Sequence, residues 1–453
     1  MIGKNYCQDR RNILWIVLIS TFVRLIFPLV NFIFDRNYWF SDGSSPYFLK
    51  GDSFYYAGVL SNFGFNNITI YILPYLFTIA TLIVFYLVCK KINIKYSFLA
   101  TILLSLFPFF YDHSLIGYVD TPHFISLCII LLVYLYILFI ENLTAKKYAL
   151  SSFLMILLVF VPLMLREVWT GFPIVTLFFF VGVVFALCRK VWHYIIFGLA
   201  SIHFIFIYIT RFLKLVMFKV LGVAEYQPPL YFVYHIMFIW AVIMFFREKR
   251  DNVMRFLFGS ALVYYVFSLF IGRFGAFAII FIVLLFFKCI KGFNAKYIFW
   301  TIIIFNVIVI GLSYLYTTPL INRPYEQMLL KANEDIDIVS FWDNGHIIKY
   351  VTGSEYGYGN HPRSEGFVQR VCKGYSLPED DAFIHLDKVR LTTPYYLVIS
   401  SRDIKKIEWL GYNLSNDSIL NKTYNNVPLD NFDLIGYSEY KNDKNWLYKR
   451  KVK

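Results

Sequence analysis

The sequence has few charged residues: only 16% are Asp, Glu, Lys or Arg, whereas a soluble domain has about 25%. It has no internal repeat and no low-complexity segment. Its six cysteines are scattered, without a Cys-x-x-Cys pair or a metal-site spacing, which argues against a disulfide framework. Carboxylates are scarcer than cations, 29 against 43. This composition is atypical of a soluble protein of 453 residues.

Long apolar segments make up most of the chain's first two thirds. Hydrophobic residues make up 58% of the chain, and the runs are separated by short basic clusters, a pattern typical of polytopic membrane proteins. About eleven runs are long enough to span a bilayer: 13–34, 68–89, 96–111, 121–141, 148–165, 170–188, 192–210, 229–246, 253–271, 273–290 and 296–317. The first run is long and lacks a small-residue cleavage site, so we expect no cleavable signal peptide.

The loops between these runs alternate in charge. Lys and Arg gather in every second loop, around residues 4–11, 90–95, 146–147, 189–190, 247–250 and 288–296. The positive-inside rule places these loops in the cytoplasm and explains the net charge of +14 without a nucleic-acid partner. The opposite, acidic set includes the outer loops 35–67, 112–120 and 211–228. The sequence therefore predicts a multi-pass cell-membrane protein with residues 1–317 as its transmembrane domain.

Residues 318–453 differ from the rest of the chain, because charged residues are frequent and apolar runs shrink to strand length. An odd helix count places this part outside the cytoplasm. The patterns predict helices at 319–333 and 402–410, and strands at 337–341, 394–400 and the two halves of 432–449. The predicted fold class is thus a polytopic α-helical bundle followed by a small extracytoplasmic α/β domain.

Three acidic residues lie on the predicted outer side: Asp52 in GDSFYYAG, Asp120 in GYVDTPH and Glu225 in GVAEYQPPL. Alone, each is an ordinary solvated loop charge. Burying such a charge at a helix mouth costs up to about 3 kcal/mol, so a compensating partner is expected. Converging carboxylates bind hard divalent cations such as Mg²⁺ or Mn²⁺. His123 follows Asp120 by about one helical turn and is either a further ligand or a hydrogen-bonded core group.

Two arginines fall within or beside apolar runs. Arg273, in IGRFGAF, lies at the predicted outer end of a helix, where its guanidinium suits a phosphate or diphosphate. The alternative is that its side chain extends to the membrane interface. Arg24, inside the first run, has the same two interpretations.

The segment FWDNGH, residues 341–346, follows the predicted strand IDIVS. A Trp, an Asp and a Gly just beyond a strand end form a turn that presents a carboxylate and an indole N–H to a small polar ligand. An ordinary Asp-Asn-Gly turn is the alternative. Further along, Asn413, Asn416 and Asn421 begin Asn-x-Ser/Thr sequons and are either glycan acceptors or chance matches in an Asn-rich segment.

FWDNGH resembles the WWDYGH motif of the oligosaccharyltransferase catalytic subunit in its archaeal form. GDSFYY, GYVDTPH, GVAEYQP and IGRFGAF resemble further motifs of this family in the same order, and REVWTGFP is similar to its W-G-G-Y-x-F-P stretch. The resemblance runs from about residue 50 to residue 350. It implies a GT-C glycosyltransferase that moves an oligosaccharide from a polyprenyl- or dolichyl-(di)phosphate carrier to Asn of a sequon. The implied partners are a lipid-linked oligosaccharide, an acceptor protein or peptide, and the membrane.

The resemblance also implies residue roles. Asp52, Asp120 and Glu225 would surround Mn²⁺ or Mg²⁺ and activate the acceptor amide, with His123 as a further metal ligand and the loop of Glu225 as a lid. Arg273 would bind the phosphate of the lipid carrier.

The sequon hydroxyl would be recognised in the C-terminal domain. The implied residues are Trp342, Asp343 and Lys406 in contact with it, supported by Phe341, Gly345, His346 and Asp403. Asp403 and Lys406 match a D-x-x-K element of the family, although an i,i+3 surface pair has the same spacing.

The chain departs from the family motifs at Phe341, where the family has Trp, and at Asn344, where it has Tyr. These changes leave open a related GT-C transferase that uses another acceptor, namely a protein hydroxyl, a glycan or a lipid. A transporter or flippase of lipid-linked sugar is a more distant alternative. Such a protein would place ionisable residues near helix midpoints and show repeated halves, whereas here the acidic residues cluster in the predicted outer loops and no repeat is visible.

Overall fold

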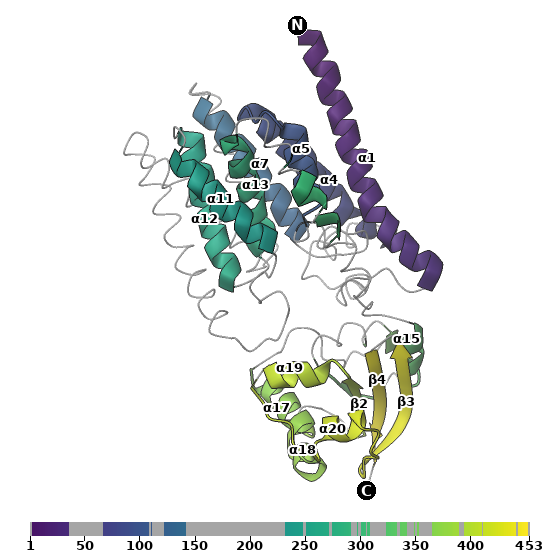
Figure 1. Ribbon diagram of the computed structural model, residues 1–453. Helices are drawn as coiled ribbons and strands as arrows, with labels where there is room; N and C mark the ends of the chain where they lie inside the picture. Colours follow the sequence, from purple (N-terminus) through teal and green to yellow (C-terminus); the bar gives the residue numbers. More distant parts are fainter. Residues whose placement is uncertain are drawn as a thin grey trace.

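The computed structural model has a bundle of helices followed by a separate α/β domain (Figure 1). It describes residues 2–35, 67–107, 110, 122–141, 232–247, 251–270, 274–290, 297, 300–304, 306–308, 323–332, 336–341, 348, 351–352, 365–388, 394–409, 411–440 and 443–451.

Seven helices of the bundle coincide with apolar runs predicted to be helical. They are α1 (Ile2–Asp35), α4 (Asn67–Lys91), α5 (Ser97–Ser105), α7 (Pro122–Glu141), α11 (Phe232–Arg247), α12 (Asn252–Phe270) and α13 (Gly275–Cys289). The predicted segments 148–165, 170–188 and 192–210 lie outside the described residues, and 296–317 is described at only a few positions. Within the described ranges, no helix combines the length and the apolarity needed to cross a membrane.

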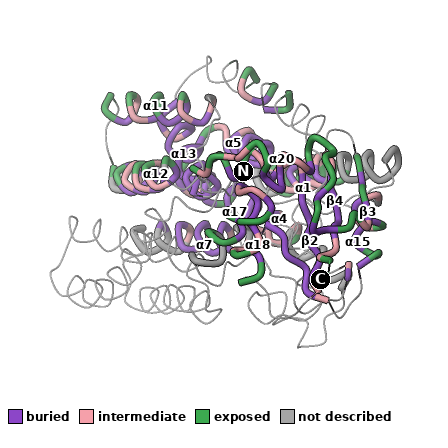
Figure 2. Tube along the Cα trace, turned by 90° about the horizontal axis from the view of Figure 1, so that it is seen from below, coloured by how far each residue is buried: buried purple, intermediate pink, exposed green. Residues whose placement is uncertain are grey.

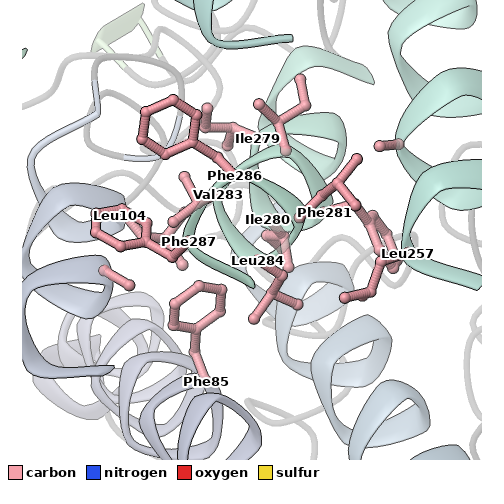
Figure 3. Packing of buried hydrophobic residues seen from close by; sticks show 14 of the residues in the cluster. Phe85, Leu104, Leu257, Ile279, Ile280, Phe281, Val283, Leu284, Phe286 and Phe287 are labelled. Atoms are coloured by element: carbon pink, nitrogen blue, oxygen red, sulfur yellow. The ribbon is translucent and has the colours of Figure 1, made fainter. Parts of the chain in front are cut away.

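Helix α13 is the centre of the bundle. Its residues from Gly275 to Phe287 are all buried, as the purple tube in Figure 2 shows. A helix that is apolar on every side lies in a protein core or in a membrane, and α13 is surrounded by α5, α7, α11 and α12. In Figure 3, Phe85 of α4, Leu104 of α5 and Leu257 of α12 point toward the side chains of α13.

Arg24 of α1 is buried in this bundle and its side chain does not extend to an interface. Its guanidinium donates to the Ser20 hydroxyl at 2.6 Å, to the Ser105 hydroxyl at 2.9 Å and to the Ser105 carbonyl at 3.1 Å. Ser105 is the last residue of α5, whose final carbonyls lack partners within the helix. Arg24 therefore joins α1 to the C-terminal end of α5.

The α/β domain contains a four-stranded sheet in the order β1-β2-β4-β3. Its strands are β1 (Ile338–Val339), β2 (Tyr396–Ser400), β3 (Phe432–Tyr440) and β4 (Asp443–Arg450), all within the predicted regions apart from one residue at the end of β4. The pair β1 and β2 is parallel, with Ile338 opposite Tyr396, and the other pairs are antiparallel.

Helices cover both faces of this sheet (Figure 1). Tyr396 and Val398 of β2 pack toward α15 (Arg323–Leu329), whereas Leu397 and Ile399 pack toward the opposite helices. Those helices are α17 (Glu365–Ser376), α18 (Glu379–Leu386), α19 (Asp403–Trp409) and α20 (Ile419–Tyr424). Since successive strand residues point to opposite faces, β2 is buried on both sides and is the rigid centre of the domain. The sequence predicted α15 and α19 but not α17, α18 or α20.

Helices α17 and α18 pack closely at Gly374. A Cβ atom added there would lie 2.5 Å from both Cγ and Cδ2 of the buried Leu386. We expect Gly374→Ala to destabilise the domain by about 1–3 kcal/mol despite the better helix propensity of Ala. Thermal unfolding of the full chain in detergent measures the change. An unchanged or raised midpoint would contradict the close packing, and Lys373→Ala, at a position exposed next to Gly374, is the matched control.

Candidate functional site

The carboxyl ends of β1 and β2 meet at one edge of the sheet, because these two strands are parallel. In open parallel α/β sheets, ligands bind beyond the carboxyl ends of the strands, and this one parallel pair has the same local arrangement. Phe341, the first residue of FWDNGH, follows β1 after Ser340, and α19 follows β2 after a two-residue turn. The topology therefore brings FWDNGH and the D-x-x-K helix to the same edge, which we call the β1–β2 edge.

Phe341 is fully buried at this edge, between α17 and α19. Its ring centroid lies 5.7 Å from the ring centroid of Tyr375 in α17. The Nζ atom of Lys406 in α19 lies 5.4 Å from the Phe341 ring centroid. The Tyr375 hydroxyl donates to the Val398 carbonyl at 2.8 Å, which fixes α17 to β2. A cation over an aromatic face is stabilised by about 0.5–2 kcal/mol. The Lys406 ammonium is thus held beside the start of FWDNGH.

Asp403 is also fully buried and fixes the start of α19. Its carboxylate accepts the Ser400 backbone N–H at 2.8 Å and lies 3.4 Å from the Lys406 ammonium. The Ser400 hydroxyl in turn accepts the Arg402 backbone N–H at 3.3 Å. The Asp403 carboxylate thus reaches back over the two-residue turn, and the Ser400 hydroxyl holds the same turn through Arg402. Asp403 therefore orients Lys406 and is itself not directed at solvent.

The nearby thiol of Cys372 is inert. Burial raises its pKa to about 12, and the negative charge of the Asp403 carboxylate adds to the rise. Because the thiolate is the reactive form, this cysteine is not a nucleophile near neutral pH. Cys372 therefore supplies no nucleophile to the β1–β2 edge.

Replacing Asp403 with Ala is expected to loosen this edge. The substitution leaves the Ser400 N–H and the Lys406 ammonium without their carboxylate partner, at a cost of about 2–3 kcal/mol. Hydrogen exchange of the full chain should show protection over residues 396–409 falling roughly 30- to 150-fold. Glu408→Ala, at an exposed position of the same helix, should change protection less than about 3-fold. Equal protection in both variants would contradict the role of Asp403.

Most of the other predicted site residues lie outside the described ranges: Asp52, Asp120, Glu225, Arg273, Trp342, Asp343, Gly345 and His346. His123 is the second residue of α7, and only its place on the helix is described. Among the described side chains, no three from His, Cys, Asp and Glu gather into a potential metal site. Convergence of the carboxylates therefore stays a prediction.

The described helix ends nevertheless show where the chain leads toward those residues. Phe107, just after α5, lies 6.3 Å from Tyr234 of α11, measured between ring centroids. The Tyr234 hydroxyl shares a hydrogen bond of 2.7 Å with the Ser268 hydroxyl of α12, and His235 Nδ1 shares one of 2.7 Å with the Tyr265 hydroxyl. We call these five residues the Tyr234 cluster.

The Tyr234 cluster joins the ends of three helices at one end of the bundle. The end of α5 leads toward Asp120, the start of α11 follows Glu225, and the end of α12 precedes Arg273 by three residues. The seven Cα–Cα steps from Glu225 to Phe232 span at most about 25 Å when extended. Sequence reasoning missed this cluster, because its residues look like any others in an apolar run. It also missed Tyr375 and Ser400, although a carboxylate three positions after Ser400 is spaced to accept an upstream backbone N–H.

Three solved structures of oligosaccharyltransferase from Archaeoglobus fulgidus resemble the chain. AglB in complex with an inhibitory peptide and a dolichol-phosphate has a TM-score of 0.67 and 13% sequence identity, over 96% of this chain and 80% of that one. The apo form has a TM-score of 0.63 and 12% identity, over 95% and 80%. The complex with Zn and sulfate has a TM-score of 0.57 and 13% identity, over 95% and 79%.

No family profile and no curated protein sequence matches the chain. The structural likeness, which extends over both the helical bundle and the α/β domain, thus stands beside the motifs that resemble the same family. It confirms the resemblance at the level of the fold: this chain has the fold of the archaeal oligosaccharyltransferases.

Proposed function

We propose that this protein is a membrane glycosyltransferase that moves an oligosaccharide from a polyprenyl- or dolichyl-(di)phosphate carrier to Asn in Asn-x-Ser/Thr sequons. The observation that supports this most is the β1–β2 edge, where Lys406 of the D-x-x-K helix lies 5.4 Å from the ring of Phe341 in FWDNGH. The fold adds support, because a structural neighbour is an oligosaccharyltransferase bound to an inhibitory peptide and a dolichol-phosphate.

A membrane location is part of this proposal. Large apolar side chains are exposed along several bundle helices, including Trp15 and Phe22 of α1, Trp240 and Phe246 of α11, and Leu262 of α12. Exposed apolar surface of this extent on helices is favoured by lipid rather than by water. Together with the basic loops on one side, it supports a catalytic face and a C-terminal domain on the non-cytoplasmic side.

The β1–β2 edge would bind the sequon. The Trp342 indole N–H and the Asp343 carboxylate would contact the Ser or Thr hydroxyl. The positive charge of Lys406 would compensate the negative charge of the Asp343 carboxylate. The described geometry explains how this turn is supported: Phe341 is buried under Tyr375 and Lys406, and Asp403 fixes the helix that presents Lys406. Gly345 and His346 would complete the turn.

The other half of the site would form beyond the Tyr234 cluster. A hard divalent cation, Mn²⁺ or Mg²⁺, would be bound by three carboxylates and one imidazole. The carboxylates are those of Asp52, Asp120 and Glu225, and the imidazole is that of His123. When bound, such an ion supplies charge stabilisation for the departing phosphate. The carboxylates would accept hydrogen bonds from the acceptor amide, a weak nucleophile, and orient it. Arg273 would bind the phosphate of the lipid carrier through its planar guanidinium.

A transfer assay tests the proposal. Purified full-length protein is mixed with Mn²⁺, lipid-linked oligosaccharides extracted from the source cells and a fluorescent peptide containing Asn-Ala-Thr. The expected product is a peptide with the glycan on Asn, identified by fragment mass spectrometry. Glycan on Ser or on a lipid would instead favour the transferase with another acceptor. Movement of the lipid carrier between the two leaflets of a proteoliposome membrane, without transfer of glycan to the peptide, would favour the flippase.

A further inference from the structure

Three sequons gather in the chain's own C-terminal domain: Asn413-Leu-Ser and Asn416-Asp-Ser between α19 and α20, and Asn421-Lys-Thr within α20. We call residues 411–418 the sequon loop. It begins at Gly411, whose φ of +83° ends α19. The Gly411 N–H donates to the Glu408 carbonyl at 2.9 Å and the Tyr412 N–H to the Ile407 carbonyl at 3.1 Å, the pattern of a Schellman motif. The loop thus leaves the helix in a fixed direction.

Two of the three sequons are blocked in the folded domain, because their hydroxyl residues are buried. Ser418, the hydroxyl residue for Asn416, is fully buried and accepts the Asn421 backbone N–H at 3.2 Å as the N-cap of α20. Thr423, the hydroxyl residue for Asn421, is fully buried too. In addition, the Asn421 side-chain amide donates to the Ser415 carbonyl at 2.8 Å. An enzyme that reads both the amide and the hydroxyl of a sequon has no access to these two pairs.

The Asn413 sequon has neither obstacle. Asn413 is exposed, while its neighbours Tyr412 and Leu414 are partly buried against the domain core, so its side chain points away from the protein. Ser415 is only partly buried. Its hydroxyl accepts the Asp417 backbone N–H at 3.3 Å, which leaves the hydroxyl proton for donation to an acceptor.

The sequon loop is held against the domain at the end of this sequon and just after it. The Ser415 N–H donates to the Ser376 carbonyl at 3.0 Å, and Pro378 bridges to Ser418. Asn413 also lies seven residues after Lys406, past the C-terminal end of α19. A loop held in this way does not reach the edge of its own domain, so a second copy of the chain has to supply the catalytic site.

We propose that Asn413 is an N-glycosylation site that another copy of this enzyme modifies, an inference that rests on the function proposed above. The Asn413 Nδ2 atom would form a bond to the anomeric carbon of the donor sugar. The bond from that carbon to the carrier phosphate oxygen breaks, its electron pair leaves with the lipid (di)phosphate, and one amide proton passes to a base. No oxidation or reduction occurs, and the lipid-linked oligosaccharide is the only co-substrate.

The test mixes two full-length copies made in a host that lacks lipid-linked oligosaccharides. The acceptor copy bears a tag and the substitution Asp52→Ala, and the donor copy is untagged and wild type. Mn²⁺, the extracted lipid-linked oligosaccharides and the Asn-Ala-Thr peptide are added, so that the peptide reports activity in the same tube. Mass spectrometry of the tagged copy should show glycan on Asn413 only when the wild-type copy is present. Asn413→Gln and Ser415→Ala should each abolish this signal, whereas the matched control Asn416→Gln should retain it.

The possible failures are distinguishable. A glycosylated peptide with unmodified Asn413 would overturn this inference and leave the proposed function intact. Glycan on Asn416 or Asn421 of the folded copy would overturn the assignment to Asn413. Modification of Asn413 in the tagged copy alone, in a tube where the peptide stays unmodified, would contradict transfer by an active second copy. If neither the peptide nor Asn413 is modified, the proposed function fails and this inference fails with it.

Discussion

The Asp52→Ala variant is expected to transfer oligosaccharide about 10²–10³-fold more slowly than the wild-type enzyme. Asp52 is proposed to be one of three carboxylates that hold the cation and orient the acceptor amide. Removing it takes away charge at the place where the glycosidic bond breaks, and electrostatic contacts there usually contribute most to rate enhancement. Initial rates of glycopeptide formation, measured at saturating peptide, quantify the loss.

Asp42→Asn is the matched control, because this second aspartate lies in the same predicted outer loop. It should retain transfer within about 2-fold of wild type. Chelation with EDTA should lower the wild-type rate, and added Mn²⁺ should restore it, whereas the Asp52→Ala variant should recover little. A fully active Asp52→Ala enzyme would remove Asp52 from the site.

The second large effect concerns the acceptor hydroxyl. A peptide with Val in place of the sequon Thr keeps the size of the side chain but lacks the hydroxyl. A site built to hydrogen-bond a substrate hydroxyl rejects the analogue without it by about 10⁴-fold in kcat/KM. We therefore expect that ratio between the Thr and Val peptides, measured in competition within one reaction.

Asp343→Ala should reduce this discrimination to less than about 10²-fold, since the group that pairs with the hydroxyl is gone. Glu408→Ala, which removes an exposed carboxylate from α19, should leave it unchanged. If wild type uses both peptides equally, FWDNGH does not read the sequon, and a transferase with another acceptor becomes the better interpretation.

The seven described helices of the bundle and the four strands followed from the sequence, because apolar runs of bilayer length and short alternating runs are strong local signals. Helices α17, α18 and α20 did not. The segment of α17 contains Gly374, and α18 and α20 have only eight and six residues. Helices this short depend on tertiary packing rather than on their own propensity. Here the helices pack against the buried face of the sheet, whose strands are distant in the sequence, so a short stretch of sequence does not reveal this contact.

The same distinction applies to the candidate site. Asp403 and Lys406 were identified from their spacing, and the parallel pairing of β1 with β2 explains why they lie beside Phe341. Tyr375 was not identified, because it reaches Phe341 from a helix that begins 24 residues later and has no motif of its own. The Tyr234 cluster joins α5, α11 and α12 through contacts between distant segments, so only a three-dimensional arrangement reveals it.

The two-residue length of β1 has a mechanical consequence. Only Ile338 and Val339 pair with β2, next to a hydrogen bond of 2.8 Å from the Tyr396 N–H to the Asp337 carbonyl. So short a border strand forms few ladder hydrogen bonds, but Ile338, Val339 and Phe341 are fully buried, so apolar packing supplies most of its attachment. Shortening any one of these three side chains would therefore loosen the anchor of FWDNGH without removing a single backbone hydrogen bond.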